Sequence, residues 1–123
     1  MGSDLAKIME GQKRMKESEA DLKRTVTDYL EYQQNAGKLL YFRLNAGDFI
    51  ELRGNTRRRV KGCMAGTSDL EIIKDGKPIF FELKSARGRT SPAQNAFKIL
   101  VEEQGASYSI VRSLEELEEL LGI

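Results

Sequence analysis

The chain has 123 residues, of which 40% are hydrophobic and 32% are charged, and its formal net charge is +1. These values are typical of one compact soluble domain, and no apolar run approaches the ~20 residues that cross a bilayer. Histidine is absent, which excludes histidine-based triads, histidine acid–base chemistry and Cys/His zinc sites. Any catalysis must therefore use carboxylates, lysine, hydroxyls or a metal held by oxygen ligands.

The single cysteine, Cys63, permits no internal disulfide and fits a reducing compartment. The first residues lack the basic and apolar regions of a secretory signal. We therefore expect a cytoplasmic protein with no membrane partner. Residues 1–17 are expected to form a short amphipathic N-terminal arm, followed by one domain over residues 18–123.

The first helix is predicted over about residues 18–36, with Gly37 just after its end. Its apolar stripe consists of Leu22, Val26, Tyr29 and Leu30. Glu19 lies three residues before Leu22, so it extends this buried stripe by one turn toward the interior. An acidic residue in a first turn also complements the helix dipole, so a purely structural role for Glu19 stays open.

A basic hairpin is predicted next, after an apolar run over residues 39–44 that is typical of a buried strand. The hairpin pairs residues 49–53 with residues 57–61 around the three-residue turn 54–56. Between residues 51 and 61, five basic residues and one acidic residue give a net charge of +4. Alternation of side chains places three of the basic residues on one face: Arg57, Arg59 and Lys61. Such a strip can neutralise backbone phosphates, and a solvated edge strand guarded by charge is the alternative.

A second hairpin is predicted around Asp75-Gly76, a pair that accepts the positive φ angles of a type I′ turn. Counting outward from this two-residue turn places Asp69 opposite Glu82. One face of the hairpin is wholly apolar: Leu70, Ile72, Ile79, Phe81 and Leu83. We expect this face to anchor the hairpin to the core.

The other face of this hairpin gathers Asp69, Glu82 and Lys84 at its open end. Like charges that lie opposite each other in a sheet are destabilising. Two carboxylates suit Mg²⁺, which takes oxygen ligands and keeps several waters. An ion pair of Lys84 with Glu82 on a solvated face is the alternative. Gly66, just before Asp69, would permit a ligand to approach the backbone closely.

A helix is predicted after a loop that carries Arg87 and Arg89. Ser91 serves as its N-cap, a proline follows at N1, and Gln94 stands at N3 as a capping-box partner. The residues expected to be buried on this helix are Ala93, Ala96, Phe97, Leu100 and Val101. A strand over residues 108–112 and a last helix capped by Ser113 complete the order α-β-β-β-hairpin-α-β-α. This order predicts an α/β (α+β) domain with a mixed β-sheet flanked by helices.

The motifs resemble a known family when they are taken together in order. They are Gly66-x-x-Asp69, Glu82-x-Lys84, Ser91-x-x-Gln94 and, after a strand, Arg112-Ser113-x-x-Glu116. This combination resembles the virus-type replication-repair nuclease (VRR-NUC) family of the PD-(D/E)xK superfamily over roughly residues 18–121, and the FRLNAG segment from residue 42 is also similar. Ser68 stands where the superfamily nominally has proline. The resemblance implies a restriction-endonuclease-like core in the order αβββαβ plus a C-terminal helix.

The resemblance also implies a function and a set of site residues. It implies a Mg²⁺- or Mn²⁺-dependent deoxyribonuclease that hydrolyses phosphodiester bonds of branched or junction DNA in replication, repair or recombination. The implied metal ligands are Asp69, Glu82, the backbone carbonyl of Leu83, and Glu19. Lys84 resembles the catalytic lysine, and Gln94 resembles the helix glutamine beside the site. The residues predicted to contact the DNA backbone are Arg57, Arg59, Lys61, Arg87 and Arg89.

Further expectations concern assembly and alternatives. The resemblance implies a homodimer, encoded by a phage and acting inside a bacterial host. A nucleic-acid-binding module on the same fold, without turnover, is the alternative function. A structural protein whose charges are all solvated is a third interpretation.

Overall fold

The fold is described from a computed structural model over residues 18–123, so the arm predicted for residues 1–17 lies outside the described residues. The elements are α2 (Glu19–Asn35), β1 (Leu40–Arg43), β2 (Asp48–Arg53), β3 (Thr56–Lys61), β4 (Leu70–Lys74), β5 (Lys77–Leu83), α3 (Pro92–Glu103), β6 (Ser107–Val111) and α4 (Leu114–Leu121). The predicted order of elements is confirmed. Between residues 18 and 123, none of the helices is both long enough and apolar enough to cross a membrane.

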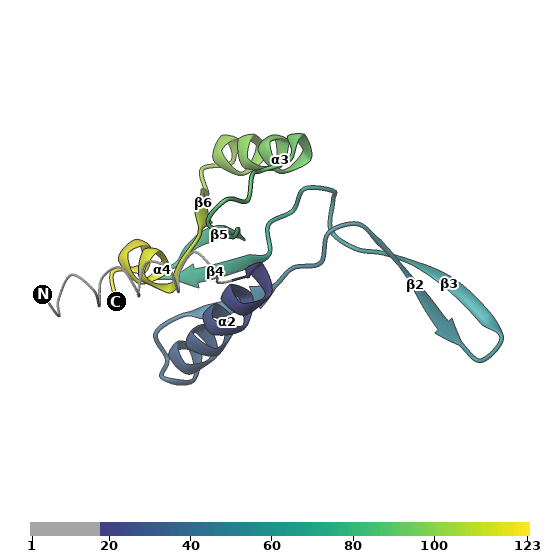
Figure 1. Cartoon of the computed structure of the whole chain (residues 1–123), viewed down its shortest axis with the longest axis horizontal. Helices are drawn as coiled ribbons and strands as arrows, with labels where there is room; N and C mark the ends of the chain where they lie inside the picture. The colour runs from purple at the N-terminus through teal and green to yellow at the C-terminus, as the bar shows by residue number, and fades with distance from the viewer. Residues whose placement is uncertain (1–17) are drawn as a thin grey trace, which may run out of the picture.

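A four-stranded sheet in the order β1-β4-β5-β6 forms the centre of the fold. β5 and β6 are parallel, and the other neighbouring strands are antiparallel. α3 makes the crossover between the two parallel strands, and it lies on the opposite side of the sheet from α2 (Figure 1). The predicted mixed sheet flanked by helices is therefore confirmed.

The β4–β5 hairpin has the register that its turn predicts. Leu70 pairs with Phe81, and the turn residues Asp75 and Gly76 have φ angles of 53° and 75°. Its apolar face packs on α2 and α4 to form the core, which includes Leu22, Val26, Leu30, Leu70, Ile72, Phe81, Leu83, Val111, Leu117 and Leu121. The polar face of the hairpin is thereby turned toward the α3 side.

Two predictions of burial are wrong. β1 is an edge strand, and although Tyr41 packs on the core, Leu40 and Phe42 are 51% and 45% exposed. On α3 the buried residues are Phe97 and Val101, so the helix covers the sheet with a narrower face than its sequence predicts. Both differences have one cause, because each element contacts the core on one side only.

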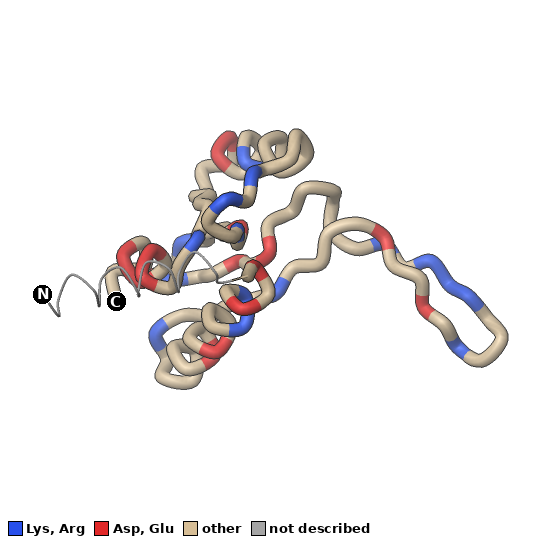
Figure 2. Tube along the Cα trace, in the orientation of Figure 1, with Lys and Arg blue, Asp and Glu red and all other residues tan. Residues whose placement is uncertain are grey.

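The β2–β3 hairpin forms a separate two-stranded sheet that projects from the rest of the fold (Figure 1). We call residues 48–61 the basic arm; the charge of β3 is visible as a blue stretch along it (Figure 2). Arg53 pairs with Thr56, so the turn has two residues, and the predicted three-residue turn is wrong. Gly54, with φ of 58°, supplies the positive φ that a glycine-first two-residue turn requires.

Gly66, in the loop before β4, packs closely against the start of α3. Its φ is 85°, and a Cβ built on it would lie 2.1 Å from the carbonyl oxygen of Ala93. No side chain fits in that space. The close approach fixes the loop that leads to Asp69 against the first turn of α3, which carries Gln94.

Replacing Gly66 by alanine should therefore destabilise the fold strongly. Gly105 is the matched control, because its φ is 83° and nothing lies within 4 Å of a Cβ built on it. We expect Gly105→Ala to cost about 1–2 kcal/mol from the left-handed conformation alone. Gly66→Ala should cost about 1–3 kcal/mol more from overlap with α3. Urea unfolding of both variants measures the difference, and equal losses would contradict the close approach.

Candidate active site

The structure brings Asp69 and Glu82 together at the open end of the β4–β5 hairpin. The Leu83 N–H donates a hydrogen bond to Asp69 Oδ2 at 2.8 Å, which holds the Asp69 side chain against β5. The proximity of Asp69 is the second-largest cause, after burial, of the raised pKa of Glu82. The hairpin register thus produces the juxtaposition that the sequence predicts.

Glu82 is a buried carboxyl group, only 4% exposed. Its Oε1 accepts a hydrogen bond from Gln94 Nε2 at 3.1 Å, whereas its Oε2 is buried and has no partner among the described residues. Burial, followed by the neighbouring Asp69, raises the pKa of Glu82 to about 8, and Lys84 acts in the opposite direction. An unpartnered buried carboxyl oxygen is costly, so this atom is the one most in need of a ligand.

Gln94 caps α3, as the sequence predicts, and it also contacts Glu82. Its side-chain Oε1 accepts a hydrogen bond from the Ser91 backbone N–H at 2.9 Å. The backbone N–H of Gln94 donates to Ser91 Oγ at 3.2 Å, which completes the capping box. The side-chain amide donates through Nε2 to Glu82. The cap therefore orients the side chain that holds the buried carboxyl group.

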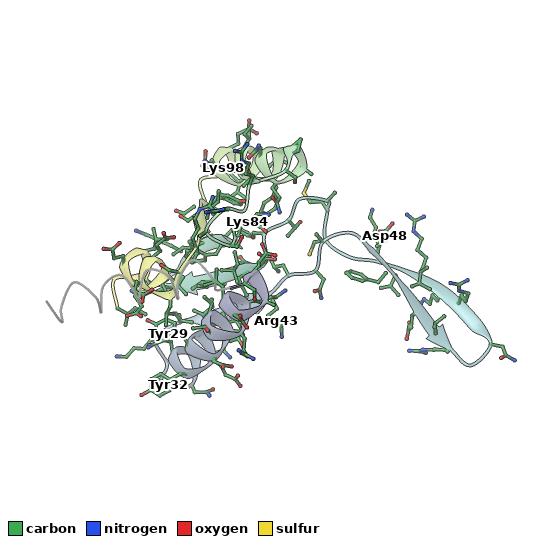
Figure 3. The ribbon with its side chains drawn as sticks, in the orientation of Figure 1. Tyr29, Tyr32, Arg43, Asp48, Lys84 and Lys98 are labelled. Carbon is green, nitrogen blue, oxygen red and sulfur yellow. The ribbon has the colours of Figure 1, made fainter. Side chains whose placement is uncertain are left out.

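Lys84 follows β5 directly and lies below α3 in Figure 3. Its backbone N–H donates to the Val111 carbonyl at 3.1 Å, which extends the pairing of β5 with β6 by one residue. Between residues 18 and 123, the ion pairs within 4.0 Å do not include one from Lys84 to Glu82. The alternative of a simple surface ion pair is therefore not what the structure shows.

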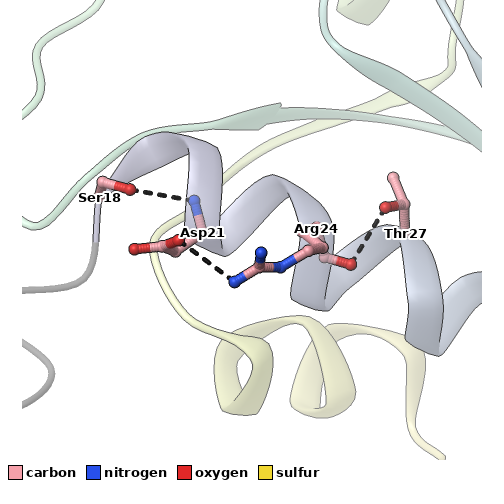
Figure 4. A network of polar contacts seen from close by, with 4 residues as sticks. All are labelled: Ser18, Asp21, Arg24 and Thr27. Atoms are coloured by element: carbon pink, nitrogen blue, oxygen red, sulfur yellow. Dashed lines mark hydrogen bonds and ion pairs between the residues drawn. The ribbon is translucent and has the colours of Figure 1, made fainter.

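Glu19 lies at the rim of the site and does not extend the buried stripe of α2. The buried residues of α2 begin at Leu22, and Glu19 itself is exposed. Ser18 caps the helix by accepting from the Asp21 N–H at 3.1 Å, and Asp21 also pairs with Arg24 (Figure 4). The charge of Glu19 nevertheless reaches the site, since it is the smallest of the causes that raise the pKa of Glu82.

Tyr108 is a site residue that the sequence did not reveal. It pairs with Phe80 in the parallel β5–β6 register, which places it on the same sheet face as Glu82. Its ring contacts Phe97 edge-on at 6.1 Å, and its hydroxyl is buried without a partner among the described residues. Burial first, and then Glu82 and Asp69, raise its pKa to about 12. A tyrosine in a strand is typical of a core residue, so only the strand pairing could have identified it.

The predicted DNA-contacting residues fall into two groups. Arg57, Arg59 and Lys61 share one face of the basic arm with Ile50 and Leu52, as the register shows. Arg59 is ion-paired to Asp48 on the same face. The second group, Arg87 and Arg89, is exposed in the loop that follows Lys84. Arg87 and Arg89 are therefore close in sequence to Glu82 and Lys84. Arg57, Arg59 and Lys61 lie on the separate β2–β3 sheet.

The acidic groups fit a cation held by few protein ligands. Among residues 18–123, no three or more His, Cys, Asp or Glu side chains gather closely enough to form a metal site, so Glu19 does not complete a three-carboxylate cluster. Mg²⁺ is commonly bound by one or two carboxylates with waters in the remaining positions. Asp69 and Glu82, whose Oε2 has no partner among residues 18–123, supply two carboxyl groups of this kind.

No protein-family model matches this chain, and a comparison with characterised proteins finds no match. The VRR-NUC resemblance consequently depends on the motif residues and on how they are arranged.

The raised pKa of Glu82 predicts a pH dependence of stability. The pKa of Glu82 is raised from its ordinary value of 4.5 to about 8, so we expect the folded, metal-free protein to keep this proton between the two values. The folded state binds more protons between these values, so the free energy of unfolding should fall as the pH rises through this window. Glu82→Gln, which is neutral throughout, should lose less stability over the same range.

Urea unfolding in the presence of a chelator, at pH 5 and at pH 8, measures this difference. Glu119→Gln, on the exposed side of α4, is the matched control and should behave as the wild type does. If Glu82→Gln and the wild type show the same pH dependence, the carboxyl group is not protonated in the fold.

Proposed function

We propose that this protein is a Mg²⁺- or Mn²⁺-dependent endonuclease that hydrolyses phosphodiester bonds in branched or junction DNA. The observation that carries the proposal is the carboxyl group of Glu82, which is buried beside Asp69 with one oxygen unpartnered. Folding alone does not favour two adjacent carboxyl groups, one of them buried. A bound cation would remove the conflict.

The arrangement of elements supports the same class of protein. If the basic arm is set aside, the elements up to β6 follow the order α2-β1-β4-β5-α3-β6, which is the αβββαβ order of a restriction-endonuclease-like core. The site lies where the two central strands and the crossover helix meet. The likeness in order and in site residues is what supports a VRR-NUC type of nuclease.

Asp69, Glu82 and the Leu83 carbonyl would hold the cation. When bound, the cation would neutralise charge on the phosphate and lower the pKa of a water that it coordinates. The protein prepares its ligands in advance: the Leu83 N–H orients Asp69, and Gln94 engages only Oε1 of Glu82. Oε2 thereby keeps its lone pairs for a ligand.

Lys84 would act on the reacting phosphate. Its ammonium group lies close enough to Glu82 to lower the pKa of that carboxyl group, so its charge also acts on the position where the phosphate would bind. A fixed positive charge there offsets the negative charge that develops on the phosphate, and it can orient the attacking water. This chemistry requires no histidine, consistent with the composition.

The basic arm and the loop arginines would hold the DNA backbone. The arm carries charge on an exposed hairpin, and contacts of this kind position a nucleic acid without reading its bases. Arg59 would exchange its partner Asp48 for a phosphate. A homodimer, which could address two strands of a junction, is part of the proposal.

A nucleic-acid-binding module without turnover is the second candidate. The basic arm favours it, because the arm could bind phosphate whether or not the carboxyl groups hold a cation. The carboxyl pair weighs against it, since two carboxyl groups would repel phosphate in the absence of a cation.

The decisive experiment is nicking of a DNA panel: single-stranded, duplex, flap and four-way-junction substrates, each with Mg²⁺ and with a chelator. We expect metal-dependent nicking that is fastest on a branched substrate. Asp69→Asn and Lys84→Ala should each slow it by at least about 10²-fold, since the first weakens the hold on the cation and the second removes a positive charge at the reacting phosphate. Glu119→Gln serves as the control and should cut at the wild-type rate.

Full activity in both Asp69→Asn and Lys84→Ala, with the fold intact by circular dichroism, would remove these residues from the site. Binding of the panel without nicking under any metal would favour the non-catalytic module.

The basic arm makes a separate prediction about salt. In an Asp69→Asn background, Arg57→Ala with Arg59→Ala should remove about two phosphate contacts and reduce the slope of log K against log[salt] by about 1.8. The control is Arg53→Ala with Arg58→Ala, which removes the same charge from the opposite face. Each pair contains one arginine bonded to an arm carboxylate, so the two are matched. Equal reductions would show that the arm acts through net charge only.

A further inference from the structure

Arg112 lies immediately after β6 and holds the loop that follows Lys84. Its Nη1 donates to the carbonyl oxygen of Ser85 at 2.7 Å and to that of Gly88 at 2.8 Å. The Arg112 N–H is itself fixed, because it donates to Glu116 Oε2 at 2.8 Å. The guanidinium group is thus a half-buried bridge between the end of β6 and one short loop.

The loop held by Arg112 lies against the stem of Lys84. The Gly88 N–H donates to the Ser85 carbonyl at 3.0 Å, which closes a turn. A Cβ built on Gly88 would lie 3.3 Å from Cβ of Lys84 and 3.4 Å from its Cδ. The turn therefore returns to cover the first part of the lysine side chain, and it leaves Arg87 exposed.

The side-chain hydrogen bonds of Arg112 occupy one of its terminal nitrogens fully. An Nη nitrogen of arginine carries two protons, and here both are directed at loop carbonyls. Nη1 has no donor left for a phosphate. Bonds from a charged donor are among the stronger hydrogen bonds in proteins, so the contact is suited to holding a loop still.

We infer that Arg112 is a positioning residue, which fixes the turn at residues 85–88 against Lys84 so that the lysine ammonium group stays aligned with Asp69 and Glu82. The inference rests on the proposed nuclease function, because the alignment matters only if Lys84 acts on a phosphate. It also gives Arg87 and Arg89 a fixed base from which to contact the DNA backbone.

The test is a double-mutant cycle on nicking of the preferred substrate, with Arg112→Ala, Lys84→Ala and the two combined. Misplacement of a catalytic group by about 1 Å costs on the order of 10²-fold in rate. We expect Arg112→Ala to lower kcat by about that factor with little change in KM. The combined variant should be no slower than Lys84→Ala alone, because Arg112 acts through Lys84. Arg24→Ala, an exposed arginine on α2, is the control and should cut normally.

Independent losses that multiply in the combined variant would overturn the inference, and so would an unchanged kcat in Arg112→Ala. If Arg112→Ala does not fold, Arg112→Lys replaces it in the same cycle, since lysine keeps the charge but lacks the planar fork.

A second measurement does not depend on nicking. Trypsin cleaves after Arg87 and Arg89, and the Arg112→Ala variant should be cut there faster than the wild type. Unchanged cleavage in an otherwise active protein overturns the inference alone. A wild-type protein that nicks no substrate with any metal overturns the proposed function, and the catalytic role of Arg112 with it.

Discussion

The carboxyl group of Glu82, removed from water beside Asp69, is the constraint on which the rest of the site depends. A buried acid must keep its proton or gain a partner, and among residues 18–123 the hydrogen bond to its side chain comes from Gln94, at Oε1. Three features bring the group there: the tight hairpin turn, the crossover helix over the polar face of the sheet, and the close contact of Gly66 with α3. Together these features enclose the carboxyl group of Glu82.

The parts of the site that local chemistry determines were predictable. A two-residue turn at Asp75-Gly76 fixes which hairpin residues face each other, so the apolar and acidic faces follow by counting. Helix caps are equally local, and the Ser91–Gln94 box was readable from four residues. The VRR-NUC resemblance combined these local features into one hypothesis, but the proximity of Asp69 to Glu82 followed from the turn alone.

What the sequence could not provide depends on contacts between distant elements. Tyr108 and Arg112 enter the site because β6 pairs in parallel with β5, and the register of a crossover connection has no turn that fixes it. Glu19 and Leu40 were expected to be buried because each continues an apolar pattern, but both are exposed. Such a pattern does not show where the neighbouring element that would cover it ends. The turn of the basic arm was one residue too long in the prediction, since a glycine can stand at either end of such a turn.

The net charge of +1 conceals a separation that bears on function. In the proposed function, the basic arm attracts a polyanion, whereas the Asp69–Glu82 carboxyl pair repels it from the end of β5, which Lys84 follows. A phosphate would approach Lys84 readily once the charge of the carboxyl pair is cancelled by protons or by a cation. Protonation would also block the carboxylate oxygens as metal ligands, whereas a bound cation would both admit the phosphate and use those oxygens, as the proposed function requires. The basic arm attracts phosphate and the carboxyl pair repels it. A bound cation would remove this conflict, so both features are compatible on one chain.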